Sequence, residues 1–66
     1  MENETVVYSF VVVGVDTSNF PPRQFSTAFW EISPEFVADA IAGAVAAAYE
    51  RLGDGGIEVR IIAITA

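Results

Sequence analysis

Few residues in the chain are of a type that performs covalent or proton-transfer chemistry. The 66 residues include no cysteine, no histidine and no lysine. A serine–histidine or cysteine–histidine pair and a Schiff-base lysine are therefore excluded. Carboxylates remain, and Glu31 with Glu35 or with Glu58 is a pair that could serve as general acid and base. No spacing favours either pair, so we interpret them as solvated charges and predict no catalytic residue and no enzyme activity.

The chain also has few residues of the types that bind metals or cofactors. Without thiolate or imidazole ligands, the chain lacks the usual donors for transition metals. The segments 16–19 (Asp-Thr-Ser-Asn) and 54–56 (Asp-Gly-Gly) are acidic and short, but they lack the ligand density of a calcium-binding loop. No glycine-rich phosphate-binding motif is present. We therefore predict no metal and no cofactor.

Binding through exposed aromatic side chains is better supported. Trp30 is the only tryptophan of the chain, and a tryptophan suits an interface anchor or a stacking platform for a flat ligand. The segment 20–23 (Phe-Pro-Pro-Arg) combines two prolines, an aromatic ring and a cation, as a rigid docking loop would. A plain connector between two strands is the alternative. The partner-binding residues that we predict are Phe20, Pro21, Pro22, Arg23 and Trp30.

The overall charge restricts the class of partner. Nine acidic residues against three arginines give a net charge of −6, so the chain cannot build the basic stripe of a nucleic-acid-binding protein. Although 53% of the residues are hydrophobic, no apolar run reaches the length of a membrane span. The acidic start of the chain is unlike a signal peptide. We expect one small cytoplasmic domain over 1–66 that binds neither nucleic acid nor membrane.

The hydrophobic pattern predicts three strands and one helix. Residues 5–15 are rich in β-branched and aromatic side chains and are apolar on both faces from Phe10 onward. A second strand is expected after the proline-containing loop, with side chains alternating between its faces. On one face we place Phe25, Thr27 and Phe29, and on the other Ser26, Ala28, Trp30 and Ile32. The elements that we predict are strands over 5–15, 25–32 and 57–65, a loop over 16–24 and a helix over 34–52.

The helix carries clear end signals. Ser33 is a suitable N-cap, Pro34 suits the first helical position, and Gly53 suits the residue that follows the last turn. Along the helix, apolar residues recur at a spacing that places them on one face, which must face the sheet. This stripe consists of Val37, Ile41, Ala44, Val45, Ala48 and Leu52.

The element order β-β-α-β predicts a fold that combines helix and sheet, written α/β in the broad sense and α+β in the narrower one. A strand–helix–strand crossover joins parallel strands, so the third strand should run parallel to the second and lie beyond the first. We therefore predict a three-stranded mixed sheet of order 2-1-3 with one helix packed on one face. A single helix covers one face of such a sheet and leaves the other face open.

The open surface predicts self-association. A chain of this length buries only about 60% of its unfolded surface, and without disulfides or a metal, oligomerisation is the remaining way to gain stability. The strand register, which the sequence does not fix, decides which of the two sheet faces points outward. The residues listed below belong to one face, and their neighbours along the strands belong to the other. The predicted interface comprises Val11, Val13, Ile62 and Ile64 on the sheet, and the small residues Ala42, Gly43, Ala46 and Ala47 on the outer face of the helix.

These observations favour a binding function. We predict a non-enzymatic protein that forms a homo-oligomer, a dimer or larger, or acts as an adaptor for a protein partner through its 16–24 loop and an acidic rim. Two alternatives remain open. One is an acidic inhibitor that mimics nucleic acid and occupies a basic site on another protein. The other is an oligomer that binds a small ligand with Trp30 in the pocket.

Overall fold

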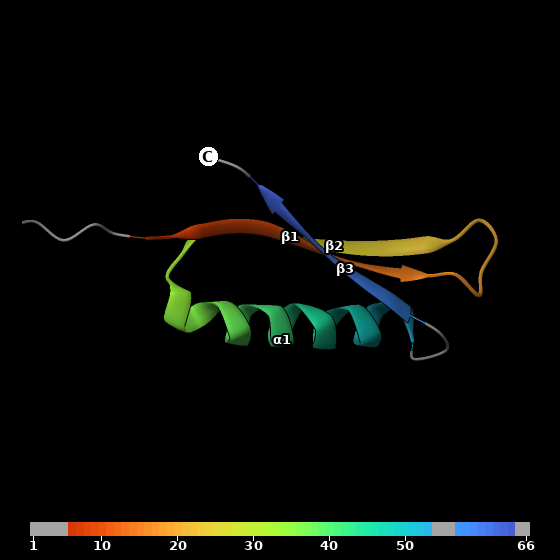
Figure 1. Cartoon of the computed structure of the whole chain (residues 1–66). Coiled ribbons are helices and arrows are strands. Elements are labelled where there is room, and N and C mark those ends of the chain that lie inside the picture. The colour runs from red at the N-terminus through yellow and green to blue at the C-terminus, as the bar shows by residue number, and fades with distance from the viewer. Residues whose placement is uncertain (1–5, 54–56, 65–66) are drawn as a thin grey trace, which may run out of the picture.

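A computed structural model describes residues 6–53 and 57–64 of the chain (Figure 1). Its elements follow the order strand, strand, helix, strand, and the sheet has the order β2-β1-β3. The predicted α+β fold is therefore confirmed, with α1 on one face of the sheet. The predicted strand residues Thr5 and Thr65, and the predicted connector 54–56, lie outside the described residues. The bounds are β1 (Tyr8–Asp16), β2 (Arg23–Ile32), α1 (Pro34–Leu52) and β3 (Ile57–Ile64).

The central strand β1 pairs antiparallel with both of its neighbours. The predicted strand order is confirmed, but the sheet is antiparallel throughout and is not mixed, because the two parallel strands lie on either side of β1. The outer strands β2 and β3 consequently run in the same direction, as predicted, and do not pair with each other. In the register of the sheet, Val12 lies between Thr27 of β2 and Ile61 of β3, whereas Val11 lies between Ala28 and Ile62. Because alternate side chains point to opposite faces, these two rows lie on opposite sides of the sheet.

The hydrophobic core lies between the helix and one face of β1 and β2. Its buried centre is formed by Phe10, Val12 and Ala44. The ring of Phe10 stacks on that of Phe29 with 5.1 Å between the ring centroids. The predicted helix stripe is confirmed, since all of its members are buried or half-buried. Its fully buried members are Ala44, Ala48 and Leu52.

Gly14 lets the helix approach the central strand closely. A Cβ atom at this position would lie 2.7 Å from the Cβ of Ala48, which is shorter than a real contact between such atoms. Gly14 is therefore required by the distance between β1 and α1. The same close approach explains why β1 directs Phe10, Val12 and Gly14 toward the helix, and Val11 and Val13 away from it.

A β-bulge near the end of β2 changes which face Ile32 occupies. Phe10 pairs with Phe29 but Tyr8 pairs with Ile32, so β2 has one more residue than β1 between these pairs. Glu31 accommodates the extra residue with a φ of 56°, and its N–H donates to the Ser9 hydroxyl at 3.1 Å. The expectation that Ile32 shares a face with Trp30 is wrong, because the bulge turns Ile32 toward the core.

The helix ends agree with the sequence signals except in one contact. Ser33 occupies the N-cap position, but its side chain makes no capping hydrogen bond. Its backbone carbonyl accepts the N–H of Phe36 at 2.9 Å, so the donor that the hydroxyl would cap is already satisfied. At the other end, Gly53 has a φ of 84° and donates its N–H to the Tyr49 carbonyl at 2.8 Å, as a terminating glycine should.

Within the part of the chain that the structure describes, the helix does not combine the length and hydropathy that a membrane span requires.

Candidate interaction surfaces

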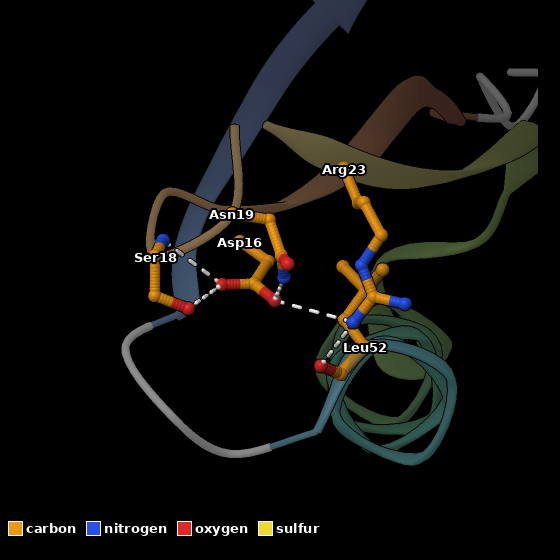
Figure 2. A network of polar contacts seen from close by, with 5 residues as sticks. All are labelled: Asp16, Ser18, Asn19, Arg23 and Leu52. Atoms are coloured by element: carbon orange, nitrogen blue, oxygen red, sulfur yellow. Dashed lines mark hydrogen bonds and ion pairs between the residues drawn. The ribbon is translucent and has the colours of Figure 1, made fainter. Parts of the chain in front are cut away.

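The loop between β1 and β2 is organised by the carboxylate of Asp16, the last residue of β1 (Figure 2). One carboxylate oxygen accepts the Ser18 N–H at 3.0 Å and the Ser18 hydroxyl at 2.5 Å. The other accepts from the Asn19 side-chain amide at 2.6 Å and from Arg23 Nη2 at 3.2 Å. An Asp followed two residues later by a bonded N–H is an Asx-turn, which fixes the start of the loop.

Arg23 connects this carboxylate to the end of the helix. Its Nη2 also donates to the Leu52 carbonyl at 3.0 Å, one of the carbonyls at a helix C-terminus that lack a partner within the helix. The Ser18 hydroxyl is the main cause that lowers the pKa of Asp16. Burial acts in the opposite direction but is outweighed by the other donors, so the pKa falls from 3.8 to about 2. Asp16 is therefore an ionised, fully engaged structural residue.

Phe20 lies on the loop supported by this network. Its side chain is 99% exposed, and Pro21 and Pro22 beside it are exposed as well. The peptide bond between Phe20 and Pro21 is cis. The loop thus presents an aromatic ring to solvent from a base that is held by hydrogen bonds.

Trp30 does not belong to the same surface as this loop. It lies seven residues along β2 from Arg23, a separation of about 23 Å at the usual rise of a strand. Its side chain is 62% exposed and lies on the sheet face away from the helix. The structure therefore divides the predicted partner-binding residues between the two ends of the hairpin: Phe20, Pro21, Pro22 and Arg23 at one, and Trp30 at the other.

The face of the sheet away from the helix is covered by no other element of the described residues; we call it the open face. Its centre is a row of valines from β1, each half-buried by its neighbours. Ile62 lies beside Val11 on one side and is 53% exposed. Of the predicted sheet interface, Val11, Val13 and Ile62 lie on this face, and Ile64 pairs with Ser9 in the same sheet. The apolar members of the open face are Val11, Val13, Val15, Ala28, Trp30 and Ile62.

The described charged residues of the open face neutralise each other. Arg60 Nη2 donates to the Glu58 carboxylate at 2.9 Å, and both side chains are largely exposed. In the register of the sheet these two residues flank Val13 and Val15. Since the whole chain has a net charge of −6, a neutral surface of this kind is the part of the molecule that two copies can bring together with the least repulsion.

The outer side of the helix is a different kind of surface. Ala42, Gly43 and Ala46 are exposed there and Ala47 is half-buried, and a Cβ at Gly43 would meet no atom within 4 Å. The four predicted small residues thus share one side of the helix. Three exposed acidic residues accompany them, so this side is negatively charged: Glu35, Asp39 and Glu50.

Potential catalytic and metal-binding groups are dispersed. Glu31 lies at the bulge of β2, Glu35 in the first turn of the helix, and Glu58 on β3 beside Arg60. Among residues 6–53 and 57–64, no three acidic side chains gather in a way that could hold a metal ion. The oxygen-bearing residues 16–19 bond to one another through Asp16.

Comparison of this chain with models of protein families, with curated proteins and with solved structures gave no match.

Two features of these surfaces were not expected from the sequence. The sequence predicts Asp16 in the loop, whereas it is a buried strand residue that holds the loop together. Its spacing to Ser18 and Asn19 is a known turn pattern and could have indicated this role. The bulge at Glu31 has no comparable local signal, because it depends on packing Ile32 against the core.

Proposed function

We propose that the protein is a non-enzymatic binding module that works by self-association, with two copies packing their open faces together. One observation carries the proposal: a single helix covers one side of the sheet, and the valine row of the other side remains open beside Trp30 and Ile62. Burial of apolar surface is the main favourable term in protein association. Trp30 is the aromatic anchor that such an interface would use.

The charge distribution supports a second copy of this chain as the partner. A symmetric pair presents the same patch twice, so the patch must be complementary to itself. The open face meets this condition, because it is apolar in the middle and its Glu58 and Arg60 sum to zero charge. A basic partner would instead be attracted to the acidic side of the helix.

The area of the face predicts a weak pair. Three strands that pair over about eight residues cover roughly 14 Å by 26 Å, which is a flat footprint of about 370 Å². Stable interfaces bury about 800 Å² on each partner. One open face packed on another therefore makes a small contact, and we expect the pair to be weaker than a standard-size interface.

Light scattering across a range of concentrations tests this proposal. The wild-type mass should rise above the 7.1 kDa of one chain as concentration increases, and the association should persist at high salt because the contact is apolar. Val13→Asp places a charge in the middle of the open face and should weaken the association. Trp30→Ser is a second variant on that face, and far-UV circular dichroism checks that both remain folded.

Ala46→Asp is the matched control, because it adds the same charge on the outer side of the helix. It should leave the association unchanged. If Ala46→Asp abolishes the association and Val13→Asp does not, the contact lies on the helix and the proposal for the open face is wrong. A wild-type chain that keeps the single-chain mass at every concentration removes self-association itself.

Two further proposals rest on narrower observations. The acidic side of the helix supports an inhibitor that occupies a basic site, and its binding to a basic partner would weaken steeply with salt. The exposed Trp30 supports a ligand-binding oligomer, in which an aromatic ligand would quench tryptophan fluorescence. Salt titration and fluorescence therefore separate both from the self-associating module.

A further inference from the structure

The two edges of the sheet differ in how well they are protected. Strand β2 carries the bulge and the positive φ of Glu31, features that interrupt the pairing of an edge with another chain. Strand β3 keeps an unbroken register with β1 from Ile57 to Ile64, and its sequence contains no proline, glycine or lysine. Such an edge offers a row of free backbone donors and acceptors to another strand.

Strand β3 is also the strand that the helix covers least. Ile61 points to the helix side and Ile62 to the open face, yet each is 53% exposed. The helix packs mainly over β1 and β2, and the C-terminal end of β3 points away from it (Figure 1). A second sheet can therefore approach the β3 edge without meeting the helix.

We infer that β3 pairs antiparallel with β3 of a second copy, in a register centred on Val59. This inference rests on the proposed self-association and identifies a second contact for it. In this register Arg60 lies directly opposite Glu58 of the other copy, and symmetry makes that pair twice. Ile61 then lies opposite Ile57, which gives the exposed side chain an apolar neighbour.

The charges select this register over its neighbours. Residues directly opposite in an antiparallel pair share a face, so a symmetric pairing must be centred on a residue. A register centred on Arg60 would oppose two arginines, and like charges opposite each other are unfavourable. A register centred on Ile61 would leave Arg60 opposite Ile62. Only the register centred on Val59 pairs both charges with opposite charges.

The paired strands would join both sheets into one, with the two helices on the same side. The open face of the joined sheet would have a footprint of about 740 Å², twice that of one copy. Doubling the footprint doubles the accessible surface that a face-to-face contact can bury, toward the roughly 800 Å² that each partner of a stable interface buries. Edge pairing thus supplies the area that a single open face lacks, and two joined sheets could then pack face to face.

Charge reversal provides the test. Glu58→Arg and Arg60→Glu each turn the two attractive pairs into repulsive ones, so each variant alone should dimerise with a dissociation constant raised by about tenfold or more. An equimolar mixture of the two variants should form a heterodimer with near wild-type affinity, because every arginine at positions 58 and 60 then faces a glutamate. Because Glu58 and Arg60 also lie on the open face, the same two variants are made in a Trp30→Ser chain, whose open face has lost its aromatic anchor. Recovery in that background reports the edge contact between copies.

Native mass spectrometry distinguishes the heterodimer from both homodimers by mass. Glu50→Arg is the matched control for Glu58→Arg, since it changes the net charge equally but lies on the helix, and it should associate like the wild type. In the Trp30→Ser chain, single variants that associate as well as their parent, or a mixture that fails to recover, would overturn the register and leave the open-face contact of the wild type standing. A wild-type chain that stays single at all concentrations would overturn both proposals.

Discussion

Val12 and Val13 are neighbours on the same strand with the same side chain, and they have different surroundings. Val12 is 2% exposed because the helix covers its side of the sheet, whereas Val13 is half-buried by its strand neighbours alone. The side chains do not differ in hydrophobicity, so the presence of a covering element makes the difference. A strand that is apolar on both faces therefore has one face satisfied within the chain and one face available for a partner.

The residues that decide which face is covered are small or polar. Gly14 and Asp16 lie on the same side of β1 as Val12. Gly14 allows the close approach of Ala48, and Asp16 receives the donors of the loop and of Arg23. The opposite side of the strand has only valines from Val11 to Val15, with no group that would admit a helix so closely.

The largest expected change in stability comes from a substitution on the covered side, where β1 and α1 approach closely at Gly14. Gly14→Ala places a Cβ 2.7 Å from the Ala48 Cβ, and neither atom can rotate away because each is bonded directly to the backbone. The free energy of unfolding should fall by about 1–3 kcal/mol. Urea denaturation at low protein concentration measures this change in the single chain.

Gly43→Ala is the matched substitution on the outer side of the helix, which no other described element covers. A Cβ at Gly43 meets nothing within 4 Å, so the gain in helix propensity should raise the free energy of unfolding by about 1 kcal/mol. Two glycine-to-alanine changes thus have opposite signs. Equal losses at both positions would contradict the difference between the covered and uncovered sides.

The element order, the strand order and the helix bounds follow from local signals. Pro34 and Gly53 mark the helix, and the valine-rich run of β1 identifies the central strand. Which face of β1 meets the helix could not be predicted from hydrophobicity, since Val11, Val12 and Val13 are alike. That choice depends on the distance between β1 and α1, a property of the packed structure.

The candidate surfaces were predictable in the same degree. The loop composition predicts the loop position of Phe20, where the structure has it exposed, whereas the roles predicted for Phe20, Val11 and Val13 stay predictions. The prediction that Trp30 and the loop form one surface is wrong, because they lie at opposite ends of β2. The bulge at Glu31 was missed because its cause, the burial of Ile32, lies in tertiary packing.

A smaller effect is expected at the bulge that transfers Ile32 to the covered side. Glu31 has a φ of 56°, a conformation that costs a residue with a Cβ about 1–2 kcal/mol. Glu31→Gly should relieve part of this cost and raise the free energy of unfolding by about 1 kcal/mol. Thermal or urea denaturation measures it, and Glu31→Ala, which keeps the Cβ, should show no such gain.

The smallest expected effect is the change in the free energy of unfolding with pH near neutrality, which depends on Asp16, the buried charge of the covered side. Its pKa is about 2 in the folded chain against an ordinary value of 3.8, so the unfolded chain binds the proton more readily. The stability that Asp16 provides is therefore complete above about pH 4 and is lost as the pH falls toward 2. Wild-type unfolding should be unchanged by this group between pH 5 and 7.

Asp16→Asn is the control for this pH dependence. The variant lacks the titrating carboxylate, so its stability relative to the wild type should improve steadily as the pH is lowered through this window. Chemical denaturation at several pH values measures the difference. A constant difference between the two proteins from pH 5 to pH 2 would show that Asp16 does not titrate with a depressed pKa.

Arg23 has a consequence for how the molecule opens. Its Nη2 bonds at once to the carboxylate that holds the hairpin loop and to the last carbonyl of the helix. Fraying of the final helical turn therefore loosens the loop, and opening of the loop releases that turn. We therefore predict that these two segments, distant along the chain, open together in local unfolding, so that hydrogen exchange of their amide protons should slow or quicken together when Arg23 is replaced.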